Sequence, residues 1–155
     1  MDLAELHEIA EREHQTRKPI RIRCCVAAGC LSANAQAVKQ RLEESVAGAG
    51  LQEQVEVCGV GCLRLCSRGP LVQVDPDGAL YENVTPDNAP AIVAALDANG
   101  SPDEASLPAR GDPAQPFFAR QLPIVLENSG SIDPERIESY IAAGGYQALY
   151  RASTR

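Results

Sequence analysis

The chain has 155 residues, 45% of them hydrophobic, and a formal net charge of −7. This size supports one compact core with appendages, and the acidic balance argues against nucleic-acid binding, because phosphates attract clustered Lys and Arg. No apolar run reaches 18 residues, so no membrane span is expected. The local basic group Arg17, Lys18, Arg21 and Arg23 is interpreted as a solvated strand edge rather than a docking patch.

Residues 1–19 are predicted to form a short N-terminal helix. Asp2 can cap it, and Glu5 follows three residues later as in a capping box. The segment is acidic and amphipathic, unlike a secretory signal, so a cytoplasmic location is expected. In a reducing compartment the six cysteines are expected to bind metal or act in redox chemistry rather than form disulfides.

Residues 20–99 have the pattern of one compact α/β domain, in the order βαββα. Alternating or β-branched runs predict strands, and runs of helix formers between caps and glycines predict helices. Ser32 is the expected N-cap of the first helix, and the turn Asp75-Pro76-Asp77-Gly78 predicts a hairpin. The expected elements are a strand at 20–26, a helix at 33–49, a strand at 55–60, a hairpin over 71–84 and a helix from 85 to Asn99-Gly100.

The remainder of the chain is expected to be a linker and a helical C-terminal tail. Residues 100–116 are rich in Pro, Gly and charge without periodicity, which is typical of a linker. Residues 117–155 contain an apolar strand-like run, a helix opened by Pro134 and stopped at Gly144, and a further helix from Tyr146. Because two half-buried elements rarely form a core alone, this tail is interpreted as the truncated start of another domain.

Three cysteines lie within nine residues in the sequence CGVGCLRLC, residues 58–66. A buried helix face with cysteines at four-residue spacing is one interpretation. Gly59 and Gly61 oppose it, because each glycine costs a helix about 1 kcal/mol relative to alanine. A glycine-rich loop after a strand is the better description.

A second group, CCVAAGC at residues 24–30, follows the first predicted strand. If the two strands and the helix between them form a βαβ unit, the strands are parallel and both cysteine loops lie at the same sheet edge. Cys25 and Cys30 then face Cys62 and Cys66 as the candidate ligand set. Cys24 points to the opposite side of its strand from Cys25, and Cys58 lies inside a strand, so both are expected to be packed thiols.

Four thiolates suit either a tetrahedral zinc ion or an iron-sulfur cluster. Uncoordinated or redox-active thiols are a third possibility, although the C-x-x-C motif of dithiol exchange is absent. The spacing alone leaves the three alternatives open. His7 and His14 are expected to be exposed rather than ligands, and Asp75 and Asp77 to belong to a turn rather than a calcium loop.

The segments IRIRCCVAAGC and GCLRLCSRGPLVQVDPDG resemble the thioredoxin-like [2Fe-2S] ferredoxin family over roughly residues 20–99. The resemblance implies a mixed four-stranded sheet with flanking helices, and a [2Fe-2S] cluster held by Cys25, Cys30, Cys62 and Cys66. It implies one-electron transfer and no catalytic residue in this chain. Arg64 and Arg68 would favour the reduced cluster if they point toward it, and are otherwise solvated loop charges.

The tail sequence PIVLENSGSIDPERIESYIAAGGYQAL resembles the initial segment of the NADH-oxidising flavoprotein subunits of complex I and its relatives. Together the two resemblances are most like the diaphorase subunit of a bidirectional NAD(P)-linked [NiFe]-hydrogenase, with NAD-dependent formate dehydrogenase as the alternative. FMN, NAD(P) and a [4Fe-4S] cluster are then expected only downstream of this chain, and other subunits of such a complex are the expected partners. A zinc-stabilised docking module is the alternative from a different class.

Overall fold

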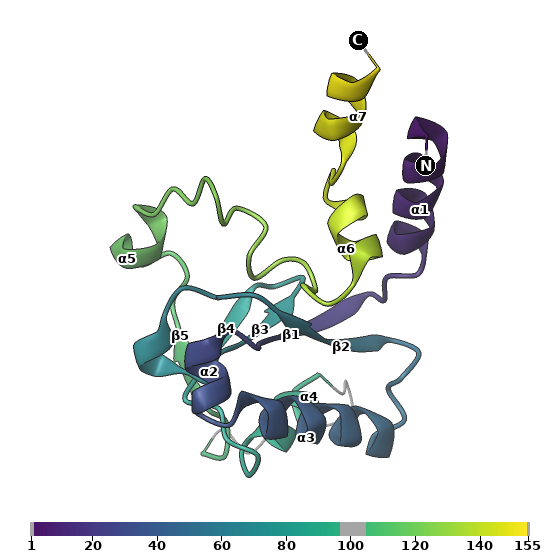
Figure 1. Ribbon diagram of the computed structural model, residues 1–155. Helices are drawn as coiled ribbons and strands as arrows, with labels where there is room; N and C mark the ends of the chain where they lie inside the picture. Colours follow the sequence, from purple (N-terminus) through teal and green to yellow (C-terminus); the bar gives the residue numbers. More distant parts are fainter. Residues whose placement is uncertain (1, 97–104, 155) are drawn as a thin grey trace.

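A mixed five-stranded sheet is the centre of the computed structural model, which describes residues 2–96 and 105–154 (Figure 1). Its strand order is β2-β1-β3-β4-β5. The strands are β1 (Ile20–Cys25), β2 (Val55–Val60), β3 (Val72–Asp75), β4 (Ala79–Glu82) and β5 (Ala109–Gly111).

The strands β1 and β2 are parallel, as predicted, with Cys25 opposite Val60 at their carboxyl ends. The strand β3 runs antiparallel to β1 and forms the predicted hairpin with β4. Gly78 has a φ of +72° at this turn, a conformation that glycine adopts without steric cost. The topology therefore places the ends of both cysteine-bearing strands at one edge of the sheet.

The fifth strand corrects two predictions. Residues 109–111 pair antiparallel with β4, although the sequence assigned them to a linker and predicted four strands. A three-residue strand is too short to show an alternating pattern, so its pairing is decided by the exposed edge of β4. The predicted order βαββα contains three strands, whereas β1, β2, β3 and β4 are already four. The predicted helix stop at Asn99-Gly100 and domain boundary at 99 lie outside the described residues.

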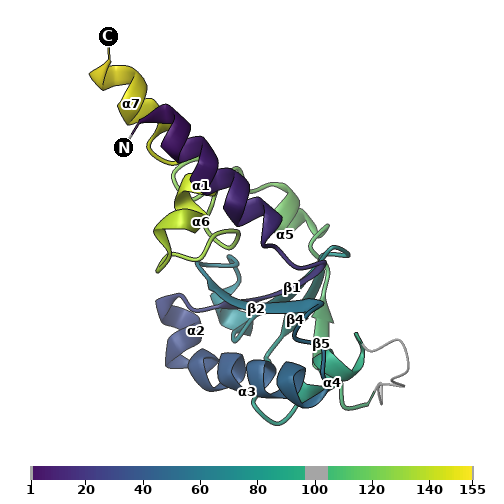
Figure 2. The ribbon, with the colours of Figure 1, turned by 90° about the vertical axis from the view of Figure 1, so that its right-hand side faces the viewer.

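Helices α2 (Ala28–Ser32), α3 (Ala35–Gly48) and α4 (Ala89–Ala94) lie on one side of the sheet (Figures 1 and 2). The predicted apolar stripe of α3 is buried against the sheet, at Val38, Leu42 and Val46. Ser32 is not its N-cap: Ser32 ends α2, and α3 follows Asn34 instead.

The helix predicted from residue 85 starts later than expected. Thr85 and Asn88 form a turn first, in which each backbone N–H donates to the other side chain, at 2.7 Å and 3.3 Å. Such side chain to backbone bonds compete with helix formation, so α4 begins only at Ala89.

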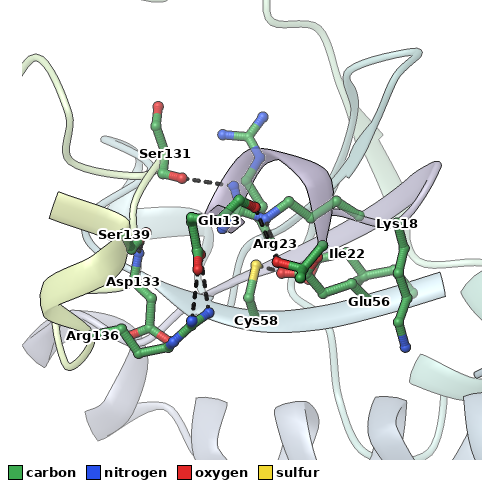
Figure 3. Close-up of polar contacts among 12 residues, drawn as sticks. Glu13, Lys18, Ile22, Arg23, Glu56, Cys58, Ser131, Asp133, Arg136 and Ser139 are labelled. Carbon is green, nitrogen blue, oxygen red and sulfur yellow. Dashed lines mark hydrogen bonds and ion pairs between the residues drawn. The ribbon is translucent and has the colours of Figure 1, made fainter. Parts of the chain in front are cut away.

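The opposite side of the sheet carries both ends of the chain. Helix α1 (Leu3–Gln15) packs against α6 (Ile137–Ala142), and α7 (Gln147–Ser153) extends the same arm (Figures 1 and 2). The capping box of Asp2 and Glu5 is present as predicted. Arg136 forms two hydrogen bonds with the Glu13 carboxylate, at 3.1 Å and 2.8 Å, which join the arm (Figure 3).

Along the chain between β5 and α6, helix α5 (Pro116–Ala119) precedes an irregular stretch. The strand predicted in the apolar run does not form: residues 122–126 are irregular, and Leu122 and Val125 are 84% and 93% exposed. None of the helices within 2–96 and 105–154 combines the length and hydrophobicity needed to cross a membrane.

The basic residues of β1 are not a solvated strand edge. The strand lies between β2 and β3, and the side chains of Arg21 and Arg23 are only 16% and 14% exposed. They lie under residues 130–131 of the tail, whose carbonyl groups accept their hydrogen bonds. Burial of these guanidinium groups is therefore compensated by the returning tail.

Candidate functional site

Two cysteine segments meet at the carboxyl edge of β1 and β2. Cys25 ends β1 and Cys30 lies in α2. Cys62 follows β2, and Cys66 begins the short 3₁₀ helix η1 (Cys66–Arg68). The parallel pairing of the strands therefore delivers both segments to the same rim, which is where α/β sheets commonly carry their sites.

The two segments are closely interlocked. A methyl group placed on Gly29 would lie 3.3 Å from the Cβ and Sγ atoms of Cys66. A methyl group on Gly69 would lie 2.9 Å from the Sγ atom of Cys30. Each glycine thus makes room for a cysteine of the other segment, so the two segments that carry the candidate ligands pack against each other.

Within each segment the two cysteines are neighbours. The sulfur atoms of Cys62 and Cys66 lie 4.0 Å apart. A hydrogen bond with Cys30 lowers the pKa of Cys25 to about 6, and backbone hydrogen bonds from Leu63 and Ala27 act in the same direction. The same hydrogen bond raises the pKa of Cys30. One of these two sulfurs is therefore readily a thiolate, the form that binds metal.

The two pairs differ in their access to solvent. Cys25 and Cys30 are buried, Cys62 is half-buried and Cys66 is exposed. Burial is also the main cause that raises the pKa of Cys62. Any group held by the four sulfurs would have one shielded side and one side close to the surface.

The two remaining cysteines are packed away from this rim. The Cys24 thiol lies 3.7 Å from the carbonyl of Ala35, and the Cys58 thiol lies 3.7 Å from the carbonyl of Ile22 (Figure 3). Burial raises the pKa of Cys24 to about 12 and that of Cys58 to about 11. Both thiols are therefore protonated at neutral pH, as expected for structural cysteines.

Backbone N–H groups point at the sulfur atoms. The N–H group of Arg64 donates to Cys62 Sγ at 3.2 Å, and Arg64 has a φ of +71°, in the left-handed region. The backbone of Leu71 forms a hydrogen bond with the Cys30 sulfur. The backbone of Leu63 forms one with the Cys25 sulfur and so links the two segments. Such donors stabilise negative charge on sulfur, which suits metal-bound thiolates.

The donor set suits either of two metal centres. Four cysteine thiolates can hold a tetrahedral zinc ion, with sulfurs about 3.8 Å apart given bonds of about 2.3 Å, or a two-iron cluster that divides them between two irons. The sulfurs in this structure form two neighbouring pairs. Across residues 2–96 and 105–154, no group of three or more His, Cys, Asp or Glu is arranged to hold a metal ion.

Charged residues near the site have different surroundings. Arg68 lies 3.5 Å from the Glu82 carboxylate, whereas the Arg64 side chain is exposed beside Cys62. His7 and His14 are exposed on α1. Sequence reasoning missed Ser129, whose Oγ atom accepts a hydrogen bond from the N–H group of Cys62 at 2.9 Å. No local pattern signals this contact, because 67 residues separate the two.

Comparisons with known proteins agree with this geometry. The profile of the family described as thioredoxin-like [2Fe-2S] ferredoxin matches residues 9–97. A protein described as "Ferredoxin, 2Fe-2S" from Clostridium pasteurianum is 37% identical over 71 residues, which cover 46% of this chain and 70% of the relative.

Solved structures show the same similarity. The wild-type thioredoxin-like [2Fe-2S] ferredoxin from Aquifex aeolicus is 26% identical, with a TM-score of 0.50, over 57% of this chain and 95% of that chain. Another structure of such a ferredoxin from the same organism has a TM-score of 0.52 at 24% identity, over 63% and 96% of the two chains, and supports the fold alone. The matched residues 9–97 include all six cysteines. The chain therefore belongs to the thioredoxin-like [2Fe-2S] ferredoxin family.

Proposed function

We propose that this chain transfers single electrons through a [2Fe-2S] cluster held by Cys25, Cys30, Cys62 and Cys66. The observation that carries the proposal is the meeting of two cysteine pairs at one sheet edge, with backbone N–H groups directed at their sulfurs. When bound, such a cluster accepts and donates one electron at a time.

The residues of this chain have distinct roles in the proposal. The buried pair Cys25 and Cys30 shields one side from water, and Leu63 and Leu71 hold its sulfurs through backbone hydrogen bonds. The outer pair is the side from which a redox partner is reached, because Cys66 is exposed. Cys24 and Cys58 only fill the core.

We further propose that the electron partners are other redox centres of a larger complex. The resemblance of residues 123–149 to the initial segment of NADH-oxidising flavoproteins supports a diaphorase of an NAD(P)-linked [NiFe]-hydrogenase. A formate dehydrogenase or complex I subunit is the alternative. FMN, NAD(P) and a [4Fe-4S] cluster would then belong to parts of the complex outside this chain. Cysteines used to bind metal rather than to form disulfides suit a reducing compartment, so we also propose a cytoplasmic location.

The test of the cluster is a chemical and spectroscopic analysis of protein purified without air. We expect two irons and two acid-labile sulfides per chain, a reddish-brown colour, and a paramagnetic signal that appears on one-electron reduction. Colourless protein with one zinc ion per chain would instead establish a zinc-stabilised docking module. A protein that incorporates neither metal after anaerobic reconstitution would contradict both.

The exposed charge of Arg64 leads to a prediction about the reduction potential. Reduction adds a negative charge, which a nearby cation favours, so Arg64→Gln is expected to lower the midpoint potential by on the order of 30 mV. Arg41→Gln on α3 is the control, because this exposed arginine pairs with Glu44 away from the site. A redox titration followed by electron paramagnetic resonance measures both. Equal potentials in Arg64→Gln and wild type would show that Arg64 has no influence on the cluster.

A further inference from the structure

Two residues of the tail, Ser129 and Gly130, lie directly on the segment that carries Cys62, and we call residues 128–131 the latch segment. The Oγ atom of Ser129 accepts a hydrogen bond from the Cys62 N–H group at 2.9 Å. The latch segment is outside residues 9–97, which match the ferredoxin family. It is therefore a contact between the tail and the proposed cluster site that the family match does not cover.

The contact is close on both sides. A methyl group on Gly61 would lie 2.6 Å from Ser129 Oγ. A methyl group on Gly130 would lie 2.9 Å from Leu63 Cδ2 and 3.1 Å from the Cys62 carbonyl oxygen, and Gly130 has a φ of +83°. Only glycine fits at positions 61 and 130 without displacing the tail from the segment that carries Cys62.

Two half-buried arginines of β1 bind the backbone of the latch segment. Arg21 Nη1 donates to the Ser131 carbonyl at 2.8 Å (Figure 3), and Arg23 Nη1 donates to the Gly130 carbonyl. Arg23 Nη2 also bonds Asp75 Oδ1 at 2.8 Å. Within the described part of the chain, the Nε atoms of both arginines have no hydrogen-bond partner, although Arg21 Nε lies 3.6 Å from Glu56 Oε1. The two guanidinium groups are therefore only partly solvated where the sheet binds the tail.

We propose that the latch segment positions Cys62, with Ser129 as the positioning residue, so that the tail fixes the outer half of the cluster site. This inference rests on the proposed function for its redox consequence only. Ser129 acts through the backbone of Cys62, because its Oγ atom is the hydrogen-bond acceptor for the Cys62 N–H group in a half-buried loop. Helix α6, which packs against α1, follows the latch segment in the chain. The latch segment therefore links the arm formed by α1 and α6 to Cys62.

The first test uses the cluster-free protein. We compare Ser129→Ala with the control Ser131→Ala, whose side chain makes no part of the contact because only its carbonyl is used. Loss of one hydrogen bond is expected to raise the alkylation rate of Cys62 by maleimide about fivefold, with Cys66 as the internal reference. Peptide mass spectrometry measures each site. Equal rates at Cys62 in both variants and wild type would overturn the proposal.

The second test uses the cluster-loaded protein. Ser129→Ala is expected to shift the midpoint potential and to shorten the half-life of the visible absorption in air, and Ser129→Thr is expected to restore both. An unshifted potential in Ser129→Ala would contradict a positioning role. If the wild-type protein binds no cluster, the proposed function fails, and the alkylation rates alone decide whether the latch segment holds Cys62.

Discussion

Replacing Cys30 with alanine is expected to abolish cluster binding. Cys30 is buried and its sulfur lies beside Gly69, next to the segment that carries Cys62 and Cys66, so no other thiol can take its place without moving the backbone. We expect the iron content after anaerobic reconstitution to fall at least tenfold. Replacing a residue that only hydrogen-bonds a metal ligand commonly weakens metal binding by about this factor, and removing a ligand itself should weaken it more. Iron analysis and visible absorption measure the effect, and Cys25→Ala, Cys62→Ala and Cys66→Ala should behave alike.

The matched control is Cys58→Ala, which removes a buried thiol that lies outside the proposed ligand set. Its sulfur lies 3.7 Å from the Ile22 carbonyl oxygen, and burial raises its pKa to about 11. We expect a stability loss of about 1 kcal/mol from the cavity and an unchanged iron content. If Cys58→Ala lost its iron while Cys30→Ala retained it, the ligand set would be wrong.

A single methyl group at Gly69 is expected to disturb the site almost as strongly. The methyl carbon of Gly69→Ala would lie 2.9 Å from Cys30 Sγ and 3.4 Å from the Cys66 carbonyl oxygen, so the sulfur must move. The φ of Gly69 is −71°, which alanine adopts readily, and the effect is therefore steric contact with the ligand rather than backbone strain. We expect the half-life of the visible absorption in air to shorten about tenfold, since ligand displacement weakens metal sites by about this factor.

Gly48→Ala is the control for this substitution. Gly48 is the last residue of α3, and a methyl group there would meet no atom within 4 Å. Alanine is expected to leave the cluster unchanged and to stabilise the helix by up to about 1 kcal/mol, as measured by thermal unfolding. Equal cluster half-lives in Gly69→Ala and Gly48→Ala would show that Cys30 does not need its observed position.

The sequence predicted the elements of the ferredoxin unit because each has a local signal. Alternation identified β1, the four-residue spacing of Val38, Leu42 and Val46 identified the buried face of α3, and Gly78 identified the hairpin turn. The meeting of the cysteine segments followed from one topological rule, that strands joined through a helix are parallel. These predictions need no knowledge of distant contacts.

Several of the features that the sequence did not predict depend on the returning tail. Arg21 and Arg23 alternate with apolar residues, which is typical of a solvated face, yet carbonyl groups more than 100 positions away cover them. Ser129 has no neighbouring motif that would mark it. The apolar run at 122–126 has a strand-like composition, but a strand also requires a partner with free backbone groups, and none pairs with it in the described chain.

The central claim is that the two cysteine pairs hold two irons together at the carboxyl edge of β1 and β2. Anomalous X-ray scattering at the iron absorption edge, from crystals grown without air, tests it most directly. We predict two adjacent iron peaks, one bonded to Cys25 and Cys30 and the other to Cys62 and Cys66. A single zinc peak at this edge, or iron bonded to Cys24 or Cys58, would contradict the account.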